Sequence, residues 1–150
     1  MTTYLRTDSD NKDFKDLVVV LDEYLRVLDG DEHVFYGQLN KTDKLKTVVV
    51  AYQNETAVGC GAIREFDKTA VEVKRMFVPE NKRGKGIATG VLKELEKWAA
   101  ELNYEKCILE TGKRQPEAIA LYEKNGYMPI ANFGKYKDVD NSVCFEKKLK

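Results

Sequence analysis

The sequence has no excess of either charge. Lys plus Arg and Asp plus Glu are each 25 of its 150 residues, so the formal net charge is zero. Nucleic-acid-binding proteins usually carry a basic excess, and we therefore expect no nucleic acid as the main partner. No apolar run approaches the roughly 20 residues that a membrane helix needs. The opening MTTYLRTDSDNKDF has no signal-peptide core, so we expect a cytoplasmic protein without a membrane partner.

Residues that bind metals or form cross-links are also scarce. His33 is the single histidine, and the three cysteines, Cys60, Cys107 and Cys144, are widely spaced and form no CxxC pair. This pattern indicates neither a zinc site nor a disulfide framework, and no metal is expected. Each cysteine lies in an apolar run, so we expect three small, buried core residues in a reducing compartment.

Hydrophobic periodicity predicts alternating helices and strands. Apolar spacing predicts a helix from Phe14 to Leu28, capped by Asp10 or Asn11 and stopped by Gly30. A shorter helix over 33–39 and a long one from Ile87 are also expected. Helix 116–124 and strands 2–7, 46–52, 56–66, 70–78, 106–110, 127–130 and 142–149 complete the list. This order predicts one α/β domain over 1–150, with a mixed, mostly antiparallel sheet of about six or seven strands and about four helices.

The stretch RGKGIATG, residues 83–90, follows a strand and opens the long helix. The first N–H groups of a helix have no backbone partner and lie at its positive end, so this turn resembles an anion site. Arg83 and Lys85 add positive charge. The turn is not a P-loop, because Lys85 is followed by Gly86, and Thr89 breaks the dinucleotide fingerprint. The alternative is that the glycines only permit a tight turn.

Two longer segments carry a resemblance to a known family. VKRMFVPENKRGKGIATGVLKELEKWAAE and PEAIALYEKNGYMPI, within about residues 70 to 130, resemble the two motifs of the GNAT superfamily of acetyl-CoA-dependent N-acetyltransferases. The family signature is Gln or Arg, two residues, Gly, any residue, then Gly or Ala. Gly84 and Gly86 match this signature. Asn81 stands in place of the Gln or Arg, and Arg83 could supply the pyrophosphate contact that this residue makes in the family. Gln115 stands where the family often has Asn.

The resemblance implies a GNAT-type fold and acetyl-CoA as co-substrate. It implies that the pantetheine arm runs like an added strand beside Met76, Phe77 and Val78, with a backbone N–H near Met76 polarising the thioester oxygen. The pyrophosphate would lie on the glycine turn, with Gln115 nearby. The implied turn residues are Arg83, Gly84, Lys85, Gly86, Ile87, Ala88 and Thr89.

Tyr122 falls where the family places its general acid. A phenol with a pKa of about 10 can protonate a thiolate whose thiol has a pKa of about 8.5. Two alternatives are a structural helix tyrosine and a residue that only positions the sulfur while water supplies the proton.

Glu72 is the candidate base, at a place where several family members carry a glutamate. It would deprotonate an acceptor ammonium with a pKa of about 8 to 10, directly or through one water. Strand alternation predicts Glu72, Lys74 and Met76 on one face and Val71, Val73 and Arg75 on the other. The alternatives are a salt bridge to Lys74 or Arg75, or a solvated glutamate.

The sequence leaves the acceptor amine open. The compact length and the aromatic late loop favour a small amine or amino acid over a peptide as the acceptor. Many relatives pair through sheet edges, so a homodimer is a further possibility. Two other readings are a non-catalytic acyl-CoA-binding domain and an ATP-binding protein. Candidate acceptor contacts are His33, Phe35, Tyr36, Gln38, Tyr127, Phe133 and Tyr136.

Overall fold

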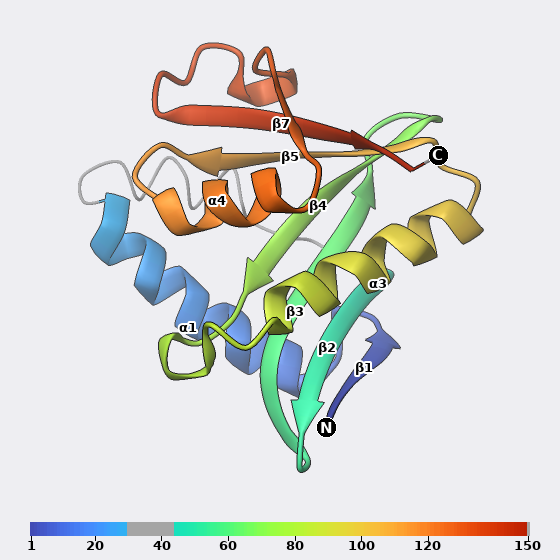
Figure 1. Cartoon of the computed structure of the whole chain (residues 1–150), viewed down its shortest axis with the longest axis vertical. Helices are drawn as coiled ribbons and strands as arrows, with labels where there is room; N and C mark the ends of the chain where they lie inside the picture. Colours follow the sequence, from blue (N-terminus) through green and yellow to red (C-terminus); the bar gives the residue numbers. More distant parts are fainter. Residues whose placement is uncertain (30–43, 150) are drawn as a thin grey trace.

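The computed structural model describes residues 1–29 and 44–149, which form one seven-stranded sheet covered by helices (Figure 1). The strands are β1 (Thr2–Thr7), β2 (Thr47–Gln53), β3 (Thr56–Glu65), β4 (Ala70–Phe77), β5 (Lys106–Gly112), β6 (Met128–Ile130) and β7 (Ser142–Lys148). The α-helices in this part are α1 (Lys12–Asp29), α3 (Ile87–Glu101) and α4 (Pro116–Lys124), with short 3₁₀ turns at η2 (Glu80–Lys82) and η3 (Gly134–Tyr136).

The expected α/β class is confirmed, with three α-helices in the described residues rather than about four. The expected helix over 33–39, with the acceptor candidates His33, Phe35, Tyr36 and Gln38, lies outside the described residues. None of the helices seen in residues 1–29 and 44–149 has the length and apolar character that crossing a membrane requires.

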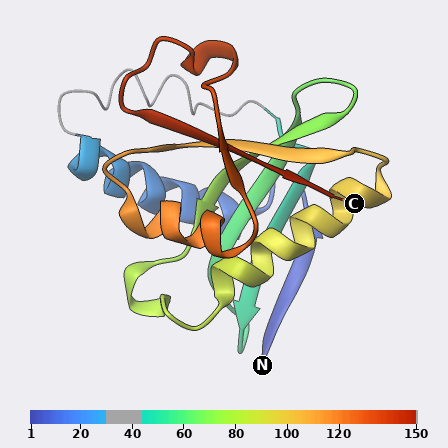
Figure 2. The ribbon, with the colours of Figure 1, turned by 45° about the horizontal axis from the view of Figure 1, so that its top comes forward.

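Helices cover both faces of the sheet (Figures 1 and 2). On one face, α1 packs Phe14, Leu17 and Leu21 into an apolar cluster with side chains from β2 and β3. On the other face, α3 and α4 enclose a larger cluster that includes Val91 and Leu95. The three cysteines are buried and free, as the sequence predicted.

The sheet order is β1-β2-β3-β4-β5-β7-β6. Of the strand pairs in the described part of the chain, β4 with β5 is parallel and the others are antiparallel. β4 and β5 pair only from Ala70 to Glu72 with Lys106 to Ile108. Beyond that point the two strands diverge, with α4 crossing near the opening (Figure 1). Among the described residues, the later half of β4 therefore has no strand partner on its β5 side, and its backbone groups there can pair with a bound chain.

A bulge in β4 changes which side chains share a face. Arg75 has a φ of 58°, and the register with β3 passes from Ala62↔Lys74 to Cys60↔Phe77. One extra residue on β4 therefore breaks the alternation. Met76 packs into the same cluster under α3 as Val71 and Val73, whereas Arg75 reaches Asp22 of α1. The expected placement of Met76 and Arg75 was wrong, because simple alternation assumes an unbroken strand.

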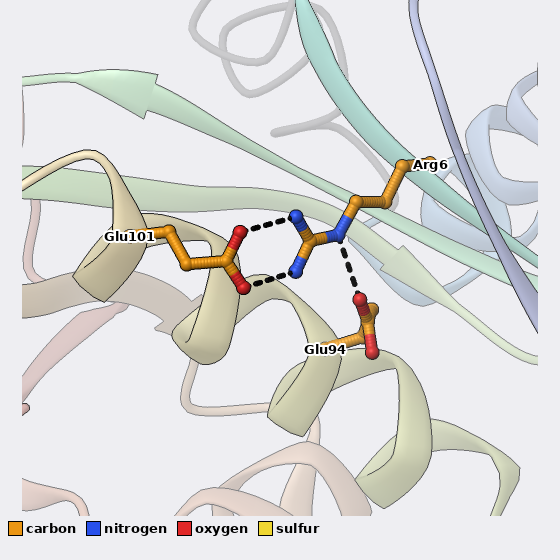
Figure 3. Close-up of polar contacts among 3 residues, drawn as sticks. All are labelled: Arg6, Glu94 and Glu101. Carbon is orange, nitrogen blue, oxygen red and sulfur yellow. Dashed lines mark hydrogen bonds and ion pairs between the residues drawn. The ribbon is translucent and has the colours of Figure 1, made fainter.

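Arg6 ties the edge strand β1 to α3 (Figure 3). Its Nε donates to Glu94 at 2.7 Å, and its two terminal nitrogens donate to Glu101 at 2.7 and 2.9 Å. The guanidinium carbon also lies 5.0 Å from the centre of the Trp98 ring. A bidentate pair with a stacked aromatic is more specific than an isolated surface ion pair, so this cluster sets how β1 lies on α3.

Gly90, the last glycine of RGKGIATG, serves packing rather than ligand binding. A Cβ at this position would lie 1.9 Å from the Tyr4 hydroxyl oxygen. We expect Gly90→Ala to lower the free energy of unfolding by about 1 to 3 kcal/mol, because Tyr4 must leave its place. Urea denaturation measures the change.

The control is Gly90→Ala in a Tyr4→Ala background, where the clash is absent. There the same substitution should gain about 0.5 to 1 kcal/mol, since Ala is the better helix former. Equal effects in both backgrounds would show that Tyr4 and Gly90 are not coupled.

Candidate functional site

The glycine turn before α3 has the geometry of an anion site. Gly84 and Gly86 have φ of 81° and 78°, and nothing lies within 4 Å of where a Cβ would stand on either. Gly86 is the N-cap of α3, with no side-chain cap and no acidic residue in the first turn. The open N–H groups and the positive helix end therefore face a space that an anionic group can fill.

Arg83 is held against this turn by contacts with several neighbours. Its Nε donates to the Val78 carbonyl at 2.8 Å, its guanidinium lies 4.8 Å from the centre of the Tyr24 ring, and its Nη1 is 3.6 Å from Glu117. Asn81 and Lys85 are exposed. Thus Arg83, rather than Lys85, is the positioned cation of RGKGIATG.

A cavity of about 410 Å³ lies beside the turn, between α1, the end of β4, and the first turns of α3 and α4. Its wall includes all but Lys85 of the residues expected to bind cofactor, namely Met76, Phe77, Val78, Arg83, Gly84, Gly86, Ile87, Ala88, Thr89 and Gln115. The charged side chains of this wall are Lys82, Arg83, Arg114, Lys124 and Glu117. The excess of positive charge suits a ligand with several phosphates.

A second, smaller cavity of about 90 Å³ adjoins the first. Met76, Gln115 and Tyr122 belong to both walls, so the two cavities meet at these side chains. The charged side chains of the smaller wall are Glu72, Lys74, Arg75 and Glu110. Among the described residues, no group of three or more His, Cys, Asp and Glu is arranged to hold a metal ion.

Sequence reasoning missed Lys74, Arg75 and Glu110 as wall residues of this cavity. A signal was present, because AVEVKRMFV places three charges inside a strand otherwise built of core residues. Charged side chains are seldom buried unless they are paired or functional. The sequence signal for Glu110 was weaker, because a charged residue at the expected end of a strand is usually exposed.

Tyr122 lies at the junction with its ring buried, 6% exposed, and packed against Tyr127 and Phe145 at centroid distances of 5.7 and 6.3 Å. No hydrogen bond found among the described residues uses its hydroxyl. Burial raises the pKa of Tyr122 above its usual value, and the negative charge of Glu110 raises it further. The phenol therefore stays protonated and can donate into the cavity.

Glu72 is oriented by two neighbours. The Tyr136 hydroxyl donates to Glu72 Oε2 at 3.0 Å, and Lys74 Nζ lies 3.7 Å from the same oxygen. The salt bridge to Lys74 that was an alternative to catalysis is thus present, although the carboxylate also borders the cavity. Of the late-loop aromatics, Tyr136 reaches this wall, whereas Phe133 packs on Phe66 and Tyr127 donates to Glu96 in the core.

Comparisons with known proteins agree with this geometry. The sequence model of the Acetyltransferase (GNAT) family matches residues 14–127. An IAA acetyltransferase of Azospirillum brasilense is 36% identical over 141 residues, covering 89% of this chain and 88% of that protein. A solved structure of a candidate acyl-CoA N-acyltransferase from Klebsiella pneumoniae has a TM-score of 0.84 and 29% identity, covering 100% and 99% of the two chains.

A GNAT family acetyltransferase from Elizabethkingia anophelis, solved with acetyl-CoA bound, has a TM-score of 0.69 and 19% identity, covering 98% and 97% of the chains. At that identity the likeness supports the fold. The chain therefore belongs to the Acetyltransferase (GNAT) family. Its activity is that of an acetyl-CoA-dependent N-acetyltransferase.

Replacing Gly86 tests the glycine turn. We expect Gly86→Ala to weaken CoA binding by about tenfold or more, because the new methyl enters the open space and the left-handed backbone costs about 1 to 2 kcal/mol. Isothermal titration calorimetry with CoA measures the affinity.

The control is Gly126→Ala, at a φ of 90° after α4 and away from the large cavity. It carries the same backbone strain, so its unfolding midpoint should fall while its CoA affinity stays unchanged. Equal loss of affinity in both variants would mean that strain, rather than the turn's contact with the ligand, is responsible.

Proposed function

We propose that this chain transfers the acetyl group of acetyl-CoA to the primary amine of a small molecule or amino acid, by direct attack on the thioester. The observation that carries the proposal is the meeting of the two cavities at Met76 and Tyr122. One cavity is large and basic, as a phosphorylated cofactor needs. The other holds about 90 Å³, well below the roughly 300 to 1,000 Å³ of drug-sized ligand sites, which favours a small acceptor.

The described residues fit acetyl-CoA, which supplies the acetyl thioester. We assign pyrophosphate binding to Arg83, Gly84, Gly86 and the first N–H groups of α3, and pantetheine binding to the open backbone edge of β4 at Met76, Phe77 and Val78. The early end of β4–β5 pairing at Glu72 and Ile108 supports this assignment. Residues 1–150 would form a single domain, since strands from Thr2 to Lys148 share one sheet.

Glu72 is assigned as the group that takes the proton from the acceptor ammonium. Glu72 and Met76 line the same small cavity, so the carboxylate would take the proton from an acceptor amine there directly or through one water. The hydrogen bond from Tyr136 keeps one carboxylate oxygen in place and leaves the other to accept. As the N–C bond forms and the C–S bond breaks, one proton leaves the nitrogen and one reaches the sulfur.

Tyr122 is assigned as the donor to the leaving sulfur. Its pKa, raised by burial, lies above the value of about 8.5 for a free thiol, so full transfer of its proton to the sulfur is uphill. A hydrogen bond from the phenol to the developing thiolate needs no such transfer and stabilises charge where it appears. We therefore place Tyr122 as a hydrogen-bond donor, with the proton reaching the sulfur through solvent.

Acetyl-CoA turnover against small amines, amino acids and peptides tests the proposal, with free thiol release as the readout. We expect small amines or amino acids to raise thiol release above the acceptor-free rate. Turnover with peptides alone would overturn the small-molecule assignment. CoA binding, seen as a thermal shift that ATP does not match, without any turnover would indicate a non-catalytic acyl-CoA-binding domain.

A further inference from the structure

Two basic side chains are buried in the wall of the small cavity. The side chains of Lys74 and Arg75 are 3% and 6% exposed. Removing a charge from water costs several kcal/mol unless partners replace its hydration. Adjacent buried cations in the proposed acceptor cavity therefore need negative partners, either from the protein or from a ligand.

The residues that the structure describes supply only part of that compensation. Lys74 Nζ lies 3.7 Å from Glu72 Oε2, beyond hydrogen-bond distance, and that oxygen already accepts from Tyr136. Burial lowers the pKa of Lys74, and the opposing effect of Glu72 is smaller than the effect of burial. Lys74 is therefore a buried ammonium whose hydration is incompletely replaced.

Arg75 shows a similar deficit. Its Nη1 donates to Asp22 at 2.8 Å, but Asp22 is half-exposed. Its Nε is the one buried side-chain polar atom in residues 1–29 and 44–149 that has no hydrogen-bond partner. Native structures rarely leave such donors unpaired, and an unpaired one at a functional site has a ligand as a natural explanation.

The position of Lys74 and Arg75 indicates which ligand would bind to them. The phosphates of the cofactor are assigned to the other cavity, at the start of α3, whereas Lys74 and Arg75 line the cavity where the acceptor enters. Glu72 and Glu110 lie on the same wall. A wall with two acidic and two basic side chains suits a ligand that bears both an amine and an anionic group.

We propose that the acceptor carries a carboxylate, which binds to Lys74 and the adjacent positive charge of Arg75, while its amine faces the junction at Met76 and Tyr122. The acceptor is then an amino acid or a similar amino-carboxylate rather than a simple alkylamine. This inference rests on the proposed function and narrows its substrate class. The carboxylate supplies the hydrogen-bond acceptors that Glu72 leaves missing at Lys74.

Matched acceptors test the inference in the wild-type protein. Each amino acid, α or ω, is compared with its own amide, and kcat/KM is expressed per concentration of neutral amine, because the two amines ionise differently. We expect at least one amino acid to exceed its amide by about tenfold or more, the scale of a hydrogen bond between charged groups. Amides that match or exceed every amino acid would overturn the inference and leave the N-acetyltransferase assignment standing.

A variant locates the carboxylate contact. Lys74→Met should raise KM for the preferred amino acid by about tenfold or more while changing kcat/KM for its amide by only about twofold, because the amide has no charge to lose. Lys137→Met removes an exposed cation that follows η3 and should leave the preference unchanged.

Equal losses for acid and amide in Lys74→Met would show that Lys74 serves only to position Glu72. If neither set of acceptors gives thiol release above the acceptor-free rate, the proposed function itself fails. The two failures are distinguished by whether the amides react.

Discussion

Replacing Glu72 with glutamine is expected to lower kcat/KM for the acceptor by about 10²- to 10⁴-fold at neutral pH, the usual range for loss of a general base. The deficit should shrink as pH rises through about 8 to 10, because the acceptor ammonium then loses its proton to solvent. Steady-state pH profiles of thiol release measure both effects.

Glu110→Gln is the matched control, since Glu110 is the other carboxylate of the small cavity and accepts from Ser142 at 2.6 Å. Glu110→Gln should lower kcat/KM far less than Glu72→Gln does, and its kcat/KM should not recover at high pH. If the Glu72→Gln deficit stays constant with pH, the carboxylate positions the acceptor instead of taking its proton. If Glu110→Gln shows the larger, pH-dependent loss, Glu110 is the base.

Replacing Tyr122 with phenylalanine is expected to lower kcat by about 10²-fold, because it removes one donor from the leaving sulfur. Acetyl-CoA binding should hardly change, since the ring and its packing on Tyr127 and Phe145 remain. The unfolding midpoint should stay close to wild type, because no hydrogen bond among residues 1–29 and 44–149 uses this hydroxyl. Kinetics and thermal unfolding together separate these effects.

Tyr127→Phe makes the same chemical change one ring away. The Tyr127 hydroxyl donates to buried Glu96 at 2.9 Å, and Glu96 also accepts from Lys147 at 2.9 Å. Losing that donor should cost about 1 to 3 kcal/mol of stability and leave kcat near wild type. A normal kcat in the Tyr122→Phe enzyme would show that Tyr122 takes no part in the chemistry. Tyr122 would then be the structural helix tyrosine that the sequence left as an alternative.

Local sequence signals predicted most of the secondary structure. Helix α4 begins at Pro116 and ends at Lys124, as expected, because proline suits the first helical turn and the segment Asn125-Gly126 suits its end. The Asn11 side chain accepts from the Phe14 N–H at 2.9 Å, so Asn11 is the cap of α1. These signals act between near neighbours in the chain, and therefore a sequence displays them directly.

The predicted and observed sites differ where distant segments meet. The glycine turn and Tyr122 were predicted because motifs mark them. The burial of Lys74 and Arg75 depends on α1 covering that end of β4, and the bond from Tyr136 to Glu72 joins residues 64 positions apart. No local pattern encodes either contact, and the bulge at Arg75 turned a correct strand prediction into a wrong assignment of faces.

The sequence by itself determined the class of fold, the family resemblance and the glycine turn, because periodicity, capping and motif spacing are properties of short segments. Only the tertiary structure decided the surroundings of each charge and each glycine. Gly84 and Gly86 leave open space, whereas Gly90 makes room for Tyr4. Lys85 is exposed while Lys74 is buried. Burial sets the cost of a charge, and burial depends on which segments pack over it.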